Sequence, residues 1–98
     1  MNDQNISSHL RSSYLMISSA FPNGINDDEY FPLLELLYNH FSDTNLAEVI
    51  SQVTGKDPSI TLNDIYRSVT MGKADKAKIK PIENKLSLHG FEEWLKEE

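Results

Sequence analysis

Three histidines are the side chains best suited to hold a metal ion or to move a proton near neutral pH. They are His9, His40 and His89. A zinc site built on histidine needs a second ligand on the same helical face, and none of the three has a histidine partner at that spacing. A pairing of His40 with Asp43 or Glu35 is the nearest arrangement. We interpret all three as surface or boundary histidines and predict no metal and no cofactor.

Catalysis by a nucleophile or by paired acids needs an activated hydroxyl or two carboxylates that face each other. The serines near the N-terminus stand in no nucleophile motif, and the chain has no glycine-rich phosphate loop. Asp27, Asp28 and Glu29 are adjacent, so on a helix they point in different directions. In a first helical turn they stabilise the free backbone N–H groups instead. We predict that the protein is not an enzyme, and an enzyme with an unrecognised site is an alternative.

One cluster of cations lies late in the chain and consists of Lys73, Lys76, Lys78, Lys80 and Lys85. Such a cluster can dock an acidic partner, a membrane surface or nucleic acid. It can also be the hydrated face of a helix that complements the acidic first part of the chain. We favour the hydrated face, and we keep Lys73, Lys76, Lys78 and Lys80 as part of a candidate interaction surface.

The formal net charge is −6, and the excess of acids lies before Lys56, where Arg11 is the only basic residue. An acidic surface repels phosphate backbones, so we do not expect nucleic acid as a partner. The chain has no cysteine, which suits a reducing cytosol. It lacks the pattern of a signal peptide, and no stretch approaches the roughly 20 apolar residues of a membrane span. We expect a cytoplasmic protein without membrane contact.

The side chains above must be positioned by helices, because apolar residues recur at spacings of three and four throughout the chain. Ile6, Leu10, Tyr14, Ile17 and Phe21 form the first such stripe. We predict an all-α fold, a compact five- or six-helix orthogonal bundle that forms a single domain over residues 1–98. Residues 1–5 are expected to be flexible.

The segment after the turn at residues 21–24 is the most apolar in the chain. Its acidic start predicts a helix from Asn26 or Asp27, but Pro32 removes a backbone donor, so we expect regular helix only from about Phe31. The apolar stripe of this segment is broad, from Tyr30 to Phe41. A stripe of that width predicts a central helix with neighbours on two sides.

Two further helices are expected near residues 46–54 and 62–71. Ser42 caps the first and Gly55 ends it. Thr61 with Asp64 resembles a capping box for the second, which should bury Leu62, Ile65, Tyr66 and Val69. A helix-turn-helix is a possible reading of this pair, but the connection from residue 55 to residue 60 is longer than usual for that motif. Arg67 is also the only basic residue on the second helix.

A fifth helix is expected from Asp75 to Gly90, and Pro81 either kinks it or marks its true start near Lys80. Residues 92–98 are expected to form a short C-terminal turn that folds back over the bundle. Leu36 and Leu88 fall off the main stripes and Tyr38 sits at a stripe edge. Together with the four lysines named above, they complete the candidate interaction surface.

Two stretches form a recognisable pattern. The first runs Phe21-Pro22-Asn23-Gly24-Ile25, and the second runs from Asp28 through Tyr30-Phe31-Pro32-Leu33-Leu34. With weaker similarity near Ser42, Asp64 and Gly90, the sequence resembles over roughly residues 10–91 the family called domain of unknown function 3349, small proteins common in actinobacteria. The resemblance implies a compact all-helical fold and no established activity. The structural signature residues are Pro22, Gly24, Tyr30, Pro32, Asp64 and Gly90.

The chain departs from the pattern of that family in two places. The family often carries arginines after the leucine pair and in its last long helix, where this chain has Tyr38-Asn39-His40 and a lysine-bearing helix with Pro81. The chain also continues past Phe91. A surface that relies on those arginines is therefore in question here.

The function that best fits these observations is a small noncatalytic protein-interaction module with an unidentified protein partner. A regulatory role and a homo-oligomer are left open. The alternatives are a nucleic-acid-binding, helix-turn-helix-like domain and an enzyme. Binding to nucleic acid would weaken steeply with added salt, whereas binding through apolar contacts would not.

Overall fold

The computed structural model describes residues 6–97, and all regular structure within them is helical. The elements are η2 (Ser8–Leu10), α1 (Arg11–Ala20), α2 (Asp27–Tyr38), α3 (Asp43–Thr54), α4 (Pro58–Thr70), η3 (Lys76–Lys78), α5 (Ile79–Ser87) and α6 (Phe91–Glu97). The radius of gyration is 12.3 Å, close to the roughly 13 Å of a compact chain of this length. The predicted all-α fold is confirmed, with six α-helices in one compact globule. The expectation of flexibility at residues 1–5 lies outside the described residues.

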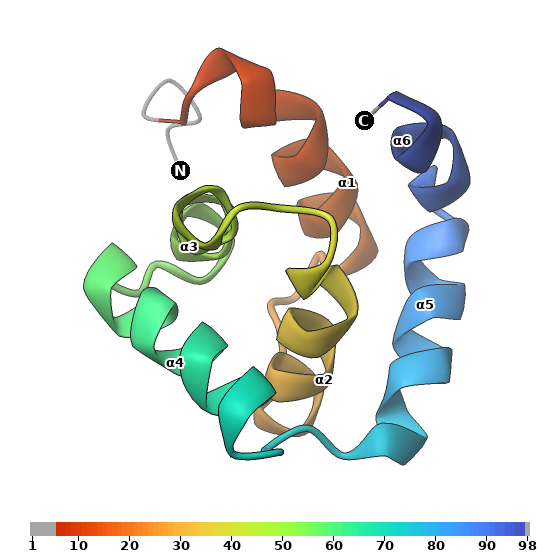
Figure 1. Cartoon of the computed structure of the whole chain (residues 1–98). Helices are drawn as coiled ribbons and strands as arrows, with labels where there is room; N and C mark the ends of the chain where they lie inside the picture. Colours follow the sequence, from red (N-terminus) through yellow and green to blue (C-terminus); the bar gives the residue numbers. More distant parts are fainter. Residues whose placement is uncertain (1–5, 98) are drawn as a thin grey trace.

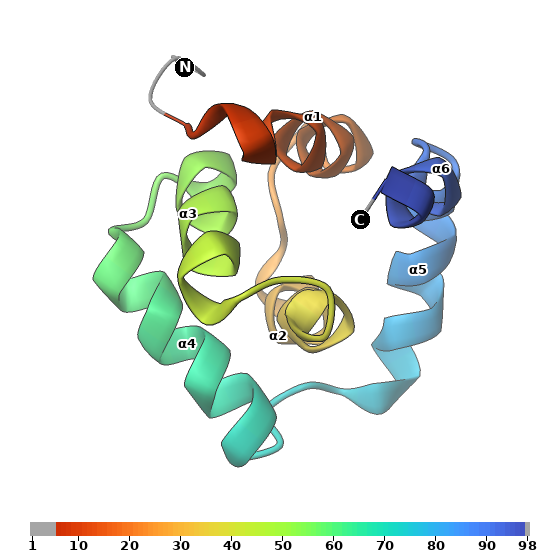
Figure 2. The same ribbon diagram turned by 45° about the horizontal axis from the view of Figure 1, so that its top comes forward.

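The helices cross at steep angles instead of running up and down in parallel. Figure 1 shows α3 almost end-on while α4 and α5 lie across the view, and Figure 2 shows α2 end-on after the molecule is turned. α2 packs against α4 on one side and α5 on the other, and α1 packs against α3, α5 and α6. The prediction that α2 is the central helix is confirmed, because it has neighbours on both sides.

The first apolar stripe is buried as predicted. Ile6, Leu10, Tyr14, Ile17 and Phe21 are all buried in the core. The start of this segment is attached to α3, since the backbone N–H of Ser7 donates to Glu48 Oε2 at 2.6 Å. Tertiary contacts thus hold a helix whose many serines are poor helix formers.

The prediction that regular helix starts only near Phe31 is wrong. α2 runs without interruption from Asp27, and Asn26 caps it in a capping box with Glu29, whose Oε1 accepts from the Asn26 N–H at 3.3 Å. Pro32 is the sixth residue of the helix and is itself buried. It leaves one carbonyl without a helical donor, that of Asp28, and this residue lies on the exposed first turn, where solvent satisfies the oxygen.

The cap of α3 is as predicted, but the start of α4 is not. Ser42 Oγ accepts from the Asn45 N–H at 3.2 Å, and Gly55 ends α3 with φ of 80°. α4 begins at Pro58, with Asp57 as its N-cap, so the expected capping box at Thr61 is wrong. A proline in the first helical turn after an aspartate is a strong start signal, because its φ is preset and it lacks the N–H that would go unused.

This earlier start shortens the connection between α3 and α4 to residues 55–57. The prediction that the connection is too long for a helix-turn-helix is therefore wrong. A three-residue turn with a left-handed glycine is within the usual length for that motif.

Pro81 stands in the first turn of α5 and marks the start of this helix, so the second of the two expectations for it is confirmed. Asp75 caps the short η3 turn ahead of it, where its Oδ1 accepts from the Ala77 N–H at 3.0 Å. α6 folds back over the bundle as predicted, with Phe91 and Trp94 buried. Among residues 6–97, no helix combines the length and the apolar character that crossing a membrane requires.

Candidate functional site

α4 is turned so that its polar side chains face the core. Thr61 and Ser68 have no exposed surface and Asp64 is 6% exposed, whereas Ile65 is the one large apolar side chain of α4 that is fully buried. These four residues follow one another at spacings of three, one and three, so they lie on one side of the helix. The buried seam of α4, by which we mean Thr61, Asp64, Ile65 and Ser68, is mostly polar.

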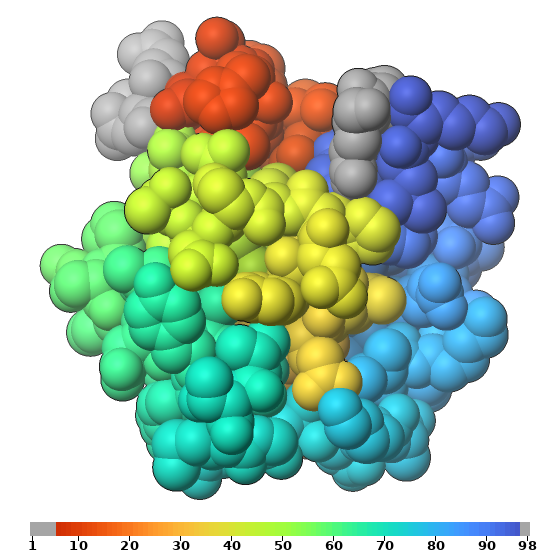
Figure 3. Space-filling model, viewed as in Figure 1, coloured from red at the N-terminus to blue at the C-terminus, as the bar shows by residue number. Residues whose placement is uncertain are grey.

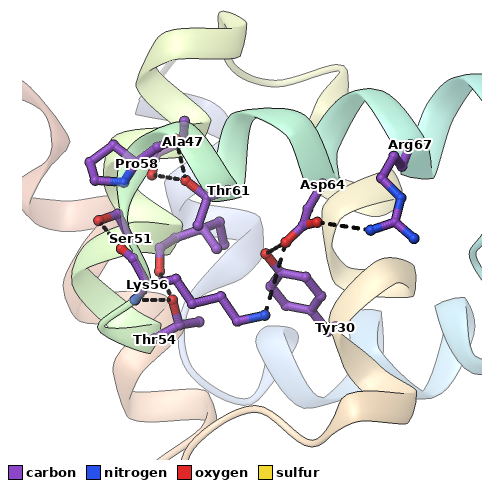
Figure 4. A network of polar contacts seen from close by, with 10 residues as sticks. Tyr30, Ala47, Ser51, Thr54, Lys56, Pro58, Thr61, Asp64 and Arg67 are labelled. Carbon is purple, nitrogen blue, oxygen red and sulfur yellow. Dashed lines mark hydrogen bonds and ion pairs between the residues drawn. The ribbon is translucent and has the colours of Figure 1, made fainter.

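The two hydroxyls of this seam tie α4 to the backbones of its neighbours. Thr61 Oγ1 donates to the Ala47 carbonyl of α3 at 3.0 Å (Figure 4). Ser68 Oγ donates to the Phe31 carbonyl of α2 at 3.0 Å. Small side chains allow the helix axes to approach closely, and each buried hydroxyl has a partner, so the desolvation cost of burying it is offset.

Asp64 lies at the centre of the polar contacts (Figure 4). Its Oδ2 accepts a hydrogen bond from the Tyr30 hydroxyl of α2 at 2.7 Å, and its Oδ1 lies 3.4 Å from Arg67 Nη1. Lys56 Nζ lies 3.9 Å from Oδ2. A buried carboxylate is costly unless it is paired, and here one donor and two cations surround it. The arrangement fixes the position of α4 on α2.

The same arrangement argues against acid and base chemistry at Tyr30. Burial raises the pKa of the Tyr30 hydroxyl far above its ordinary value, and the hydrogen bond to Asp64 and the charge of that carboxylate raise it further. The phenol is thus a proton-bearing donor over the whole physiological range. Lys56 Nζ lies 4.0 Å from the centre of the Tyr30 ring, a cation–π contact that covers the outer side of the pair.

A shallow pocket of about 210 Å³ borders this pair and is lined by Gly24, Ile25, Asp27, Tyr30, Val53, Thr54 and Lys56. Its volume is below the roughly 300–1,000 Å³ of ordinary small-molecule sites. The pocket is therefore a shallow depression beside the Tyr30–Asp64 pair, and it is too small for most cofactors.

The apolar side chains of α4 lie mainly on the outside. Ile60 is 53% exposed, Tyr66 is 43% exposed, and Met71 at the C-cap is 64% exposed. In Figure 3 the teal surface of α4 lies open at the edge of the molecule, with no other element in front of it. We call Ile60, Asn63, Tyr66, Arg67, Thr70 and Met71 the outer face of α4.

The predicted buried stripe of this helix is therefore correct only at Ile65. Leu62 and Val69 are half-buried and Tyr66 is exposed. Tyr66 is also held in place, because a hydrogen bond with Asp43 at the start of α3 and the charge of that carboxylate raise the pKa of its hydroxyl. The prediction failed because the polar side of α4 had partners on α2 and α3 that the sequence did not reveal.

The three apolar residues of the predicted interaction surface lie on two elements. Leu36 and Tyr38 of α2 are half-buried and pack against the core, whereas Leu88 at the end of α5 is 84% exposed. Exposed apolar residues that stand singly on a surface are ordinary in monomers. The exposed apolar residues Ile60, Tyr66 and Met71 lie on one element, and of these three only Tyr66 was predicted to be buried.

Most of the predicted lysine cluster is paired with acids. Within residues 6–97, Lys76 pairs with Glu35, Lys78 Nζ lies 3.2 Å from Asp28 Oδ2, Lys85 Nζ lies 3.0 Å from Glu29 Oε2, and Lys80 Nζ lies 3.1 Å from Glu83 Oε1. The first three pairs join η3 and α5 to α2. Lys73 is exposed and forms no ion pair within the same residues.

The signature residues of the sequence lie at turns and at the centre of the fold. Gly24 and Gly90 have φ of 91° and 92°, a conformation that favours glycine, and Pro22 stands in the turn before Gly24. Pro32 is buried inside α2. Tyr30 and Asp64 are bonded to each other, a pairing that the sequence did not predict because nothing in it relates positions 34 residues apart.

Two of the three histidines, His9 and His40, line a broad groove of about 470 Å³ between α1, α6 and the loop between α2 and α3, whereas His89 lines a separate hollow between α1 and α6. No acid, lysine or arginine lines this groove, which is bordered by His9, Leu10, Ser12, Ser13, Asn39, His40, Phe41, Ser42, Asn45 and Trp94. The His40 ring meets the rings of Phe91 and Trp94 edge-on, with centroids 6.1 and 6.0 Å apart. In the part of the chain that the structure describes, no three metal-ligating side chains come together.

A family model described as a protein of unknown function (DUF3349) matches residues 9–94, which is most of the chain. No curated protein and no solved structure matches.

Proposed function

The chain belongs to this family of proteins of unknown function, and from its geometry we propose that it is a small noncatalytic protein-interaction module whose partners dock on the outer face of α4. The observation that carries the proposal is the orientation of α4. Three of its polar side chains are buried and satisfied, while Ile60, Tyr66 and Met71 remain in solvent.

The five large apolar residues exposed in the described chain are unevenly placed. Three of them, Ile60, Tyr66 and Met71, lie on α4 or its C-cap, and the other two are Leu15 and Leu88. Exposed apolar groups that cluster on one element mark interaction surfaces more often than scattered ones do. Arg67 stands among them, and arginine and tyrosine are enriched among residues that dominate binding energy.

A noncatalytic role fits the chemistry of the groove beside His40 and of the pocket beside Tyr30. The groove is lined by no acid, lysine or arginine, and the pocket is small. The pKa of the Tyr30 hydroxyl is raised, so this group keeps its proton at neutral pH. Catalytic acids and bases usually have a pKa near the pH at which the enzyme works. Absence of cysteine from the chain supports placing the module in a reducing cytosol.

The short connection between α3 and α4 supports the helix-turn-helix alternative, but the charge of the domain argues against it. The cations that α4 and its turn offer, Arg67 and Lys56, both lie against Asp64. Asp57 occupies the N-cap of the would-be recognition helix, where a DNA phosphate or base would approach. With a net charge of −6, the domain is a poor ligand for a polyanion.

Affinity capture with matched variants tests the proposal. We would compare the tagged wild type with the double variant Ile60→Gln, Met71→Gln, in nuclease-treated lysate of the cells that make the protein. The matched control is Leu15→Gln, Leu88→Gln, which removes two exposed apolar residues from other elements. Circular dichroism and thermal melts confirm that each variant is folded.

We expect a stoichiometric protein partner that survives nuclease, is lost in the α4 variant and is retained in the control. Equal capture by both variants would place the docking surface elsewhere and reject the proposal. Recovery of nucleic acid alone, with binding that falls steeply as salt rises, would favour the helix-turn-helix alternative.

A further inference from the structure

The turn between α1 and α2 carries an asparagine followed directly by a glycine, and Asn23-Gly24 is the only such pair in the sequence. The Gly24 N–H donates to the Phe21 carbonyl at 3.0 Å and closes the turn. Pro22, Asn23 and Gly24 are exposed. Phe21 before them is buried, and Ile25 after them packs against the core. The pair therefore lies in solvent, on a short stretch whose two ends are held by the core.

An asparagine in this position can react with the backbone of the next residue. A base such as hydroxide removes the proton of the Gly24 N–H, and the nitrogen attacks the side-chain carbonyl carbon of Asn23. The new carbon–nitrogen bond closes a five-membered succinimide ring. The bond from the same carbon to the side-chain nitrogen breaks, and this nitrogen takes a proton from water and leaves as ammonia.

Water then opens the succinimide at one of its two carbonyls and returns a proton to the Gly24 nitrogen. Opening at the side-chain carbonyl gives aspartate. Opening at the main-chain carbonyl gives isoaspartate, in which the main chain runs through the side-chain carbons. The whole reaction consumes one water and releases one ammonia, so it needs no other reactant.

The structure leaves room for this ring. A Cβ placed on Gly24 would meet no atom within 4 Å, so no other part of the described chain crowds this side of the residue. Gly24 has a φ of 91°, in a region where glycine moves freely. Within residues 6–97 the Asn23 side chain forms no hydrogen bond that would hold it away from the Gly24 nitrogen.

The attack requires the hydrogen bond between the Gly24 N–H and the Phe21 carbonyl to open. That bond lies in an exposed turn outside the helices, where water can replace the carbonyl as acceptor. Exposed bonds of loops open locally at a small cost in free energy, without unfolding of the domain. The folded state therefore gives access to the reactive geometry.

The other asparagines of the described chain are placed less favourably. Asn26 lies at the start of α2 and Asn39 at its end. The residues that follow them, Asp27 and His40, carry side chains that hinder closure of the ring. Three more stand inside helices, where the next backbone N–H is part of the helical hydrogen-bond ladder: Asn45, Asn63 and Asn84.

We propose that Asn23 is a modification site, at which the folded protein deamidates without an enzyme to aspartate and isoaspartate. The proposal is independent of the proposed docking on α4, because it rests on the turn between α1 and α2. The reaction adds one negative charge to a chain of formal net charge −6. In the isoaspartate form it also adds one methylene to the main chain, and the exposed residues 22–24 can take up this length in solvent. We expect both products to stay folded.

Timed incubation of the purified full-length protein at mildly alkaline pH tests the proposal. Proteolytic digestion and mass spectrometry locate each amide that has become an acid, and electron-transfer fragmentation distinguishes aspartate from isoaspartate. The matched variant is Asn23→Gln, which keeps an exposed amide at this position but closes the larger six-membered ring far more slowly. Asn39 in the same sample is the internal control, and a parallel sample is unfolded in guanidinium chloride.

We expect Asn23 to convert several-fold faster than Asn39 in the folded wild type. Anion exchange should separate a more acidic species from the wild type and not from Asn23→Gln. Conversion of Asn23 only in the unfolded sample would mean that the turn protects the amide, and it would overturn the proposal. Equal conversion of Asn23 and Asn39, or an equal yield of acidic species from Asn23→Gln, would overturn it too, because the reaction would not depend on this turn.

Circular dichroism of the separated acidic species tests whether the reaction belongs to the folded protein. A helical spectrum and a cooperative thermal melt are expected. Loss of the helical spectrum in that species would contradict the expectation that the turn absorbs the longer main chain.

Discussion

The Tyr30 hydroxyl donates a hydrogen bond to Asp64 Oδ2 at 2.7 Å, and this buried contact joins the central helix α2 to α4 across 34 positions of sequence. Asp64 is 6% exposed and Tyr30 is 6% exposed, so neither group is solvated by bulk water. Because this bond orients α4 on α2, the pair helps to determine which α4 residues reach solvent.

Removal of the Tyr30 hydroxyl should destabilise the protein. Tyr30→Phe keeps the ring but leaves Asp64 with only its longer contacts to Arg67 and Lys56, at 3.4 and 3.9 Å. We expect a loss of about 1–3 kcal/mol in the free energy of unfolding, measured by urea denaturation. Tyr66→Phe is the control, because it removes a hydrogen bond to a carboxylate, that of Asp43, at an exposed position, and it should cost much less than Tyr30→Phe. Similar losses of unfolding free energy in the two variants would show that the buried Tyr30–Asp64 bond contributes no more to stability than an exposed one.

Alkaline pH should weaken the fold through the same tyrosine. The pKa of Tyr30 is raised in the folded state from its ordinary value of 10.0, so the folded protein holds this proton more tightly than the unfolded chain does. Its contribution to stability is complete below pH 10 and falls as pH rises above that value, by up to about 1.4 kcal/mol per pH unit.

The measurement is the difference in unfolding free energy between wild type and Tyr30→Phe as pH rises past 10. All other ionisable groups are the same in both proteins, so the comparison isolates the contribution of Tyr30. The difference should shrink with increasing pH. A constant difference would mean that the Tyr30 pKa is the same in the folded and unfolded states.

The start of α4 depends on Asp57. Its Oδ1 accepts from the Ser59 N–H at 2.8 Å and from the Ser59 hydroxyl at 2.6 Å, and these bonds lower the pKa of the Asp57 carboxyl. We expect Asp57→Ala to lower the melting temperature and Asp57→Asn to retain most of it, since asparagine is also a good N-cap. The stabilisation by Asp57 is present above its ordinary pKa of 3.8 and is lost as pH falls below it. Equal melting temperatures for wild type and Asp57→Ala would place the helix start elsewhere.

The attachment of α6 depends on a bond between Trp94 and α1. Trp94 Nε1 donates to Ser13 Oγ at 2.8 Å, and both residues are buried. Ser13→Ala removes the acceptor and leaves the indole N–H unsatisfied, so we expect a loss of about 1–3 kcal/mol. Ser19→Ala, on the exposed side of the same helix, should cost much less. Trp94 is the only tryptophan, so its fluorescence reports both the unfolding transition and any change at α6 in the native state.

Local signals in the sequence were enough for most helix boundaries. Ser42 at the start of α3, Gly55 at its end and the turn after Phe21 were all predicted and are all observed. Caps and turns act through backbone groups one to four residues away, so the information lies within the segment itself. The start of α4 was missed because a weaker local signal at Thr61 was preferred to Asp57-Pro58.

The candidate site was largely hidden from the sequence. The amphipathic pattern of α4 predicted that Tyr66 would be buried, and Thr61 with Asp64 was predicted to form a capping box; both predictions were wrong. A polar residue can be buried only where a partner is held for it. The partners here are the Tyr30 hydroxyl and the Phe31 and Ala47 carbonyls, supplied by α2 and α3.

The sequence by itself determined that this chain is all-α, that α2 is central, and that the apolar stripe from Ile6 to Phe21 is buried, because these follow from periodicity and from capping within each segment. Only the tertiary structure decided which side of α4 faces the core and which acids of α2 pair with Lys76, Lys78 and Lys85. Both depend on distances between groups far apart in sequence, and a buried hydrogen bond or ion pair is favourable only once packing has brought its two partners together and excluded water.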